Sequence, residues 1–178
     1  MADIEVEHKG EVAWIRLNRP DRMNAYDGAM ARELIAAVEG ASESGVIVLT
    51  GVGRAFCAGG YLANLSKADP AALRKMFYGS LHVYEAIRNS PRPVIAAVNG
   101  AAAGGGNELV VACDLAIAVE SATFGQTGVR VGSAPVLGGT NFLAMTIGET
   151  SRLPSCRRSA CPKKLSARAS GVMCQCMS

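Results

Sequence analysis

Apolar residues recur along this chain with two spacings, and the two spacings alternate from segment to segment. Short, mostly apolar runs, which are typical of strands, occur at 12–17, 46–51, 94–98 and 115–119. Longer segments place apolar side chains at helical spacing, at 27–39 and 70–87. Strands that alternate with helices predict repeated βαβ units, so we expect an α/β fold with a mostly parallel sheet flanked by helices.

Residues at the ends of these segments agree with that assignment. The alternation before and after Gly10 predicts a β-hairpin over 4–17. Asp27 is a typical helix N-cap residue, because its carboxylate accepts hydrogen bonds from the first free N–H groups. Asp69 and Pro70 open the second long helix, where proline is tolerated in the first turn. The chain therefore predicts an N-terminal hairpin followed by helices that begin near Asp27 and Asp69.

The segment 93–109 holds the strongest candidate chemistry. An apolar strand ends before Asn99, and three adjacent glycines, Gly104–Gly106, precede a helix that carries Glu108. Adjacent glycines weaken regular structure, so their presence indicates that something approaches the backbone closely. Free N–H groups at a strand-to-helix junction favour negative charge. A developing oxyanion is one candidate for that place.

A second glycine-rich turn follows the strand at 46–51. Gly59 and Gly60 come after a short run of small residues and again precede an expected helix start. Two such turns after two parallel strands each offer one N–H group to the same oxygen, and this is the arrangement that an oxyanion hole requires.

Length, charge and cysteine usage exclude several other classes. The 178 residues indicate one domain, and a net charge of +3 is too small to indicate nucleic-acid binding. No apolar run approaches the ~20 residues of a membrane span, and the acidic start is unlike a signal peptide. Only Cys57 and Cys113 precede residue 151, which favours a reducing, cytoplasmic setting. The later cysteines lack metal-site spacing, so we expect no metal.

Three segments of the chain resemble the crotonase (enoyl-CoA hydratase/isomerase) superfamily. Residues 17–25 resemble its first CoA-contacting loop, 56–60 its first oxyanion loop and 99–126 its second. Gly104–Gly106 does not fit the Gly-x-Gly-x-x-Gly pattern of dinucleotide-binding proteins. The resemblance implies a crotonase-like spiral of βαβ units and activity on acyl-CoA thioesters.

The resemblance also implies roles for individual residues. Gly60 and Gly105 match the two oxyanion-hole donors, each through its backbone N–H, and Glu108 matches the first catalytic glutamate of the hydratases. Contacts with the acyl-CoA substrate are implied at Arg22, Met23, Ala58, Gly60, Tyr61, Gly128 and Ser133. Coenzyme A is part of the substrate, so no separate cofactor is expected. A homo-oligomer, trimer or hexamer, is implied as well.

Several of these residues also have an ordinary structural interpretation. The glycines serve equally in plain turns, and Glu108 also suits a surface or salt-bridged position on its helix. Arg22 is alternatively a solvated charge, and the ring of Tyr61 alternatively packs against the next helix. Ser133 is alternatively a turn residue. No Gly-x-Ser-x-Gly segment is present, which disfavours a Ser-His-Asp hydrolase.

One position departs from the two-glutamate hydratases of this superfamily. Those enzymes carry a second glutamate twenty residues after the first, where this chain has Gly128. Because paired carboxylates handle the water and the α-proton in simple hydration, the glycine disfavours that reaction. The naphthoyl-CoA synthases and the alicyclic acyl-CoA ring-opening hydrolases share this glycine, and the hydrolases also share a segment like 132–135. A ring-bearing acyl group is the resulting expectation.

Residues 151–178 do not continue the pattern. They have no clear period, and every charged side chain among them is basic. Crotonase relatives continue instead with amphipathic helices that complete the acyl pocket and the trimer interface. We therefore expect a core at 1–150 and an atypical, cysteine-containing tail that is read in a shifted frame or belongs to a truncated product. The alternative function is a catalytically inactive fragment that retains only CoA or subunit binding.

Overall fold

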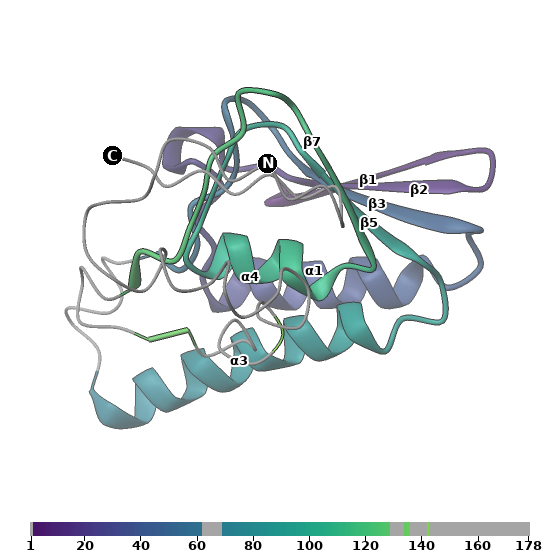
Figure 1. Cartoon of the computed structure of the whole chain (residues 1–178). Helices are drawn as coiled ribbons and strands as arrows, with labels where there is room; N and C mark the ends of the chain where they lie inside the picture. The colour runs from purple at the N-terminus through teal and green to yellow at the C-terminus, as the bar shows by residue number, and fades with distance from the viewer. Residues whose placement is uncertain (1, 62–68, 129–133, 136–141, 143–178) are drawn as a thin grey trace.

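The computed structural model describes residues 2–61, 69–128, 134, 135 and 142 (Figure 1). It opens with an antiparallel hairpin of β1 (Ile4–Lys9) and β2 (Val12–Leu17), in which Lys9 is opposite Val12. Gly10 turns the chain with a φ of 59°, a left-handed conformation that glycine adopts at little steric cost. The predicted hairpin is confirmed.

The hairpin leads into a five-stranded sheet. Its order is β1-β2-β3-β5-β7, and β2, β3, β5 and β7 run parallel to one another. The further strands are β3 (Val46–Gly51), β5 (Val94–Val98) and β7 (Leu115–Ala118). The α/β class and the mostly parallel sheet expected from the apolar pattern are therefore confirmed.

A second, three-stranded parallel sheet consists of β4 (Ala55–Cys57), β6 (Ala101–Ala103) and β8 (Phe124–Gly125). The chain alternates between the two sheets, because β4, β6 and β8 each follow a strand of the larger sheet. This alternation is the expected spiral. The sequence pattern had placed the glycine-rich turns directly after the long strands, and this was wrong: they follow β4 and β6, which are too short to show a period.

The helices begin where the capping residues predict. The Asp27 carboxylate accepts hydrogen bonds from the N–H groups of Ala29 and Met30 at the start of the first helix. The Asp69 carboxylate accepts from the N–H of Ala72 in the second. The helical bounds are α1 (Gly28–Gly40), α3 (Pro70–Arg88) and α4 (Gly105–Ala112), with a 3-10 turn at Pro20–Arg22. In Figure 1, α1, α3 and α4 lie together below the strands of the larger sheet.

The core lies between the larger sheet and these helices. Ile15 and Leu49 from the sheet and Met30 and Leu34 from α1 belong to one buried cluster. Burying side chains of this size contributes about 1.5–3 kcal/mol each. The division expected between a core at 1–150 and a tail at 151–178 falls outside the described residues, and it stays a prediction.

Candidate active site

The first glycine-rich loop follows β4 and lies beside the chain that precedes α1. Tyr26 forms a parallel bridge with Gly60: the Tyr26 N–H donates to the Gly59 carbonyl at 2.9 Å, and the Tyr61 N–H donates to the Tyr26 carbonyl at 2.9 Å. Tyr26 thus uses both of its backbone groups toward this loop, and the N–H of Gly60, the residue between the two hydrogen bonds, points away from Tyr26. Within the described residues, no acceptor takes the Gly60 N–H. The loop therefore offers one backbone donor that no described residue uses.

The second loop links β6 to α4. Gly104 caps the helix with a φ of 53°, and its N–H donates to the Gly125 carbonyl at 2.8 Å. The first intrahelical bond is made by the Glu108 N–H to the Gly104 carbonyl. The N–H of Gly105, the first helical residue, thus has no intrahelical acceptor and lies at the positive end of the helix dipole.

The two loops are pressed against each other. A Cβ atom on Gly59 would lie 2.7 Å from the Ala103 carbonyl oxygen and 2.9 Å from the Gly105 nitrogen. A Cβ on Gly106 would overlap the Cys57 carbonyl oxygen. Only glycine permits these approaches, because a side chain at either position would collide with backbone atoms. The structure therefore brings Gly60 and Gly105, predicted separately, into adjoining loops.

The surroundings of Gly60 and Gly105 differ. A Cβ on Gly105 would lie 2.6 Å from the Tyr26 hydroxyl oxygen, so protein fills the space beside it. A Cβ on Gly60 would meet no atom of the described residues within 4 Å. Among the described residues, space is therefore open at the Gly60 side of the paired loops.

Glu108 lies inside the protein, one turn into α4. Its exposed fraction is 3%, which excludes the alternative of a surface residue. Burial raises the pKa of the Tyr26 hydroxyl, and the electrostatic effects of the nearby Cys57 and Glu108 side chains raise it further. Burial and the Glu108 charge also raise the pKa of Tyr84. The Glu108 charge therefore acts on two tyrosines of other segments.

The residues expected to contact CoA gather around the first loop. The Ala58 N–H donates to the Met23 carbonyl at 2.9 Å, and the Arg22 guanidinium lies 4.7 Å from the centre of the Tyr61 ring. Met23 has a left-handed φ of 52°, which is uncommon for a residue with a side chain. The Arg22 side chain is exposed, as its alternative as a solvated charge requires. The Tyr61 ring is half-buried.

Gly128 and Ser133 are the other two positions at which a substrate contact is predicted. Gly128 is half-buried and supplies no carboxylate. Ser133 lies outside the described residues. Between β8 and Gly128, the side-chain nitrogen of Gln126 is buried without a hydrogen-bond partner among the described residues.

Asn24 is an organiser of the site that the sequence pattern did not single out. Its side chain is fully buried, and its Nδ2 donates to the carbonyl oxygens of Val52, Ala55 and Phe56 at 2.8–3.2 Å. Its Oδ1 accepts from the Arg19 N–H at 2.9 Å. Asn24 thereby fastens the segment before α1 to the strand that leads into the first glycine loop. Only its place in the 17–25 segment could have pointed to it.

Two further polar residues were also missed. The Tyr26 hydroxyl is hydrogen-bonded to Ser80, whose own hydroxyl donates to the Met76 carbonyl at 3.1 Å. Tyr84 lies one helical turn further along α3, and its hydroxyl is buried. Both look like core aromatic residues in the apolar pattern, so the pattern alone could not identify them.

The two cysteines of the described core are not nucleophiles. Burial raises the pKa of the Cys57 thiol to about 12, although the Gly59 N–H donates to its sulfur at 3.3 Å. The Cys57 thiol itself donates to the Asn24 carbonyl at 3.2 Å. Burial also raises the pKa of Cys113. Because the thiolate is the reactive form, both side chains have structural roles.

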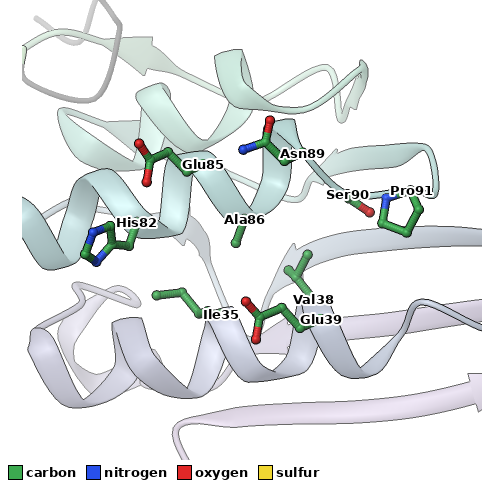
Figure 2. A pocket seen from close by; sticks show the side chains of 9 residues that line it. All are labelled: Ile35, Val38, Glu39, His82, Glu85, Ala86, Asn89, Ser90 and Pro91. Carbon is green, nitrogen blue, oxygen red and sulfur yellow. The ribbon is translucent and has the colours of Figure 1, made fainter.

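A groove of about 450 Å³ between α1 and α3 is separate from this site (Figure 2). It contains none of the residues predicted to act in chemistry. Both apolar and polar side chains line it. The lining residues are Ile35, Val38, Glu39, His82, Glu85, Ala86, Asn89, Ser90 and Pro91. The described residues contain no cluster suited to hold a metal ion. No helix of the described part is long and apolar enough to cross a membrane.

Comparison with known proteins agrees with the geometry. Residues 7–152 match the family model described as enoyl-CoA hydratase/isomerase. A probable enoyl-CoA hydratase of Rhodobacter capsulatus is 44% identical over 147 residues, which are 82% of this chain and 57% of that protein. The short-chain-enoyl-CoA hydratase of Clostridium acetobutylicum is 35% identical over 150 residues, 82% of this chain and 58% of that protein.

Solved structures give the same result. The enoyl-CoA hydratase of Bacillus anthracis superposes with a TM-score of 0.81 at 35% identity, over 85% of this chain and 61% of that one. Pseudomonas aeruginosa DspI superposes with a TM-score of 0.83 at 32% identity, over 87% of this chain and 65% of that one. The chain thus spans little more than half the length of the relatives that it matches in sequence.

Proposed function

The chain belongs to the enoyl-CoA hydratase/isomerase family, and from that premise we propose that it transforms acyl-CoA thioesters through an enolate intermediate. The observation that carries the proposal is the contact between the two glycine loops. It holds the unused N–H of Gly60 and the helix-terminal N–H of Gly105 in adjoining segments. Two fixed donors of this kind suit one shared oxygen.

The proposed chemistry explains why the donors are backbone groups. Removing or adding a proton beside a thioester carbonyl places negative charge on the carbonyl oxygen. Donors that are already oriented toward that oxygen stabilise the charge without reorganising, and each contributes on the order of 3 kcal/mol. The dipole of α4 adds to this effect at Gly105, since the helix begins there.

Glu108 is proposed as the acid or base that moves the proton. It lies on the same helix as Gly105 and three residues after it, so its side chain projects from the first turn. Its burial removes it from bulk water, and a positioned acid or base contributes about 10²–10⁴-fold in rate. A carboxyl on a solvated surface would not have this advantage.

The CoA part of the substrate is proposed to lie against the first loop. Arg22, Met23, Ala58 and Tyr61 gather there, and the space beside Gly60 is open. The exposed Arg22 guanidinium suits an anionic group of CoA. No cofactor other than this substrate-borne group is required. A homo-oligomer and a cytoplasmic setting remain predictions.

The acyl group is proposed to be cyclic. Gly128 leaves the position of a second glutamate without a carboxylate, and glycine there is shared with the naphthoyl-CoA synthases and the ring-opening hydrolases. Because glycine has no side chain, Gly128 would also leave room for a bulky acyl group. The predicted contact at Ser133 belongs to the same proposal.

The second candidate function is a protein that binds CoA or another subunit without catalysis. Both candidates predict CoA binding, and only the first predicts turnover.

The test measures turnover and binding together. We expect the chain to convert at least one thioester in a panel of linear and cyclic enoyl-CoA substrates. Glu108→Gln should lower kcat by about 10²-fold or more while acyl-CoA binding persists. Glu85→Gln, on the exposed side of α3, is the matched control and should keep the rate. Binding without turnover would favour the alternative, and an unchanged rate in Glu108→Gln would remove that residue from the mechanism.

A further inference from the structure

The side chains of Arg22 and Tyr61 form a contact beside the first glycine loop. The Arg22 guanidinium lies over the Tyr61 ring, 4.7 Å from its centre. A cation in this position is attracted by the negative face of the ring. Arg22 ends the 3-10 turn before α1, whereas Tyr61 directly follows Gly60, whose open side has no described atom within 4 Å of a Cβ. The contact therefore links two segments of the chain next to that open space.

Backbone hydrogen bonds hold both ends of this contact. The Ala58 N–H donates to the carbonyl of Met23, the residue after Arg22, at 2.9 Å. The Tyr61 N–H donates to the Tyr26 carbonyl at 2.9 Å. The two side chains are thus brought together by segments that are already fastened to each other. Little further ordering of the backbone is needed to keep the guanidinium on the ring.

The stacked Arg22 guanidinium keeps donors for a ligand. Stacking uses the face of the guanidinium and leaves the N–H groups along its edge free to bind an anion. Among the described residues, its carboxylate neighbour is Asp21, whose oxygen lies 3.7 Å from Nε, beyond hydrogen-bond range. Both side chains are exposed, so solvent weakens this ion pair. An anionic ligand can therefore take these donors without displacing a hydrogen bond to Asp21.

Arg16 shows the other use of a stacked arginine. Its guanidinium also lies over a ring, that of Trp14, at 5.7 Å from the centre. However, its Nη2 donates to the Glu7 carboxylate at 2.8 Å, so a protein group takes the donor. Arg16 thus forms a closed cluster on the hairpin, whereas Arg22 combines a closer ring with donors that point to a ligand role.

We propose that Tyr61 is a positioning residue whose ring holds the Arg22 guanidinium for a phosphate group of CoA. The inference rests on the proposed function, which places CoA against the first loop, and it adds a role for Tyr61 that acts through Arg22. A guanidinium suits phosphate because its parallel N–H groups donate to two oxygens at once. A long side chain loses freedom when it binds a ligand, and stacking on the ring removes part of that freedom beforehand. The ring therefore raises the affinity for CoA.

The experiment is a double-mutant cycle in the full chain, with the dissociation constant of butyryl-CoA measured by calorimetric titration. Arg22→Gln should weaken binding by about tenfold or more, because it removes a charge-assisted contact. Tyr61→Leu removes the ring and should weaken binding about threefold, in the range of an exposed cation–π pair. The double variant should bind as Arg22→Gln does, because Tyr61 acts through Arg22. Tyr61→Phe, which keeps the ring, should restore the affinity that Tyr61→Leu loses.

A second probe and a control variant separate this role from a general effect on the loop. S-butyryl-pantetheine carries the thioester and the pantetheine arm but no phosphate. In nuclear magnetic resonance titrations, Arg22→Gln and Tyr61→Leu should bind it within about twofold of the parent chain. Trp14→Leu removes the ring beside Arg16 and should bind butyryl-CoA within about twofold of the parent chain.

Three results would overturn the inference while the proposed function stands. Additive losses in the double variant would show that Tyr61 acts without Arg22. An equal loss of S-butyryl-pantetheine binding in Tyr61→Leu would show that the phosphates are not involved. A loss in Tyr61→Phe as large as in Tyr61→Leu would assign the effect to the hydroxyl rather than the ring. If the parent chain binds neither probe nor any acyl-CoA of the panel, the inference and the proposed function both fail.

Discussion

The two glycine loops look alike in sequence, but the structure builds them differently. The second loop is held by close packing, since Gly105 lies against Tyr26 and Gly106 against the Cys57 carbonyl. The first loop is held by hydrogen bonds from the segment before α1, through Asn24 and Tyr26, and it has open space at Gly60. Glycine therefore has a structural role in the second loop and a ligand-facing one at Gly60. Three substitutions test this distinction.

The largest expected effect is on folding, at Gly106. In Gly106→Ala the new methyl group would overlap the Cys57 carbonyl, and backbone atoms cannot move aside as a flexible side chain can. We expect a loss of about 3 kcal/mol or more of unfolding free energy, at the upper end of overpacking effects, measured by urea denaturation. Gly79→Ala on α3 is the control. Its methyl meets no atom within 4 Å, so it should be neutral or stabilising. A normally stable Gly106→Ala protein would show that the loops are not pressed together.

A smaller effect is expected at Gly60, and it should appear in binding rather than in stability. Gly60→Ala adds a methyl group to open space, so the unfolding free energy should stay within about 0.5 kcal/mol of the parent chain. If this space receives the thioester, the methyl should weaken butyryl-CoA binding by about tenfold, because overpacking of that size costs 1–3 kcal/mol. If a stable Gly60→Ala protein binds butyryl-CoA as tightly as the parent chain does, the ligand does not bind against this loop.

The sequence predicted the frame of the molecule better than its site. The patterns of β2, β5, α1 and α3 were strong because each of these elements has one buried face, and β3 was recognised as a continuous apolar run. β4, β6 and β8 were missed, since strands of only two or three residues are too short to show a period and form only against their neighbours.

The same limit applies to the site residues. The glycines of both loops and Glu108 were found because they follow one another closely along the chain. Tyr26 and Tyr84 were not, because their rings fit the core pattern and they belong to segments far from Glu108 in the sequence. Residues that join a site through tertiary contact leave no local signal.

The smallest expected effect concerns Asp27, the N-cap of α1, whose carboxylate also pairs with Arg19 in the segment before that helix. Burial alone would raise the pKa of Asp27, but its hydrogen bonds from Arg19 and from the Met30 N–H outweigh burial and lower it. A lowered folded-state pKa means that this stabilisation is present above the unfolded value and is lost as the pH falls below it, from about 4 downward.

Asp27→Ala should therefore cost about 1 kcal/mol at pH 7, a typical N-cap value, and less as the pH falls below 4. Asp21→Ala, at an exposed carboxylate of the 3-10 turn, is the control and should cost little at either pH. Denaturation curves at pH 7 and pH 3 provide the comparison. If Asp27→Ala lowers the unfolding free energy equally at both pH values, the charge of the Asp27 carboxylate does not contribute to stability.

The central claim is that the backbone N–H groups of Gly60 and Gly105 bind the thioester oxygen. Isotope-edited infrared spectroscopy of butyryl-CoA with a ¹³C-labelled thioester carbonyl tests it directly, because this saturated probe does not undergo hydration and its C=O stretch reports hydrogen bonding. We predict a bound carbonyl band at lower frequency than in water, since two fixed donors polarise the C=O bond more than solvent does. A bound band at or above the frequency in water would contradict the claim.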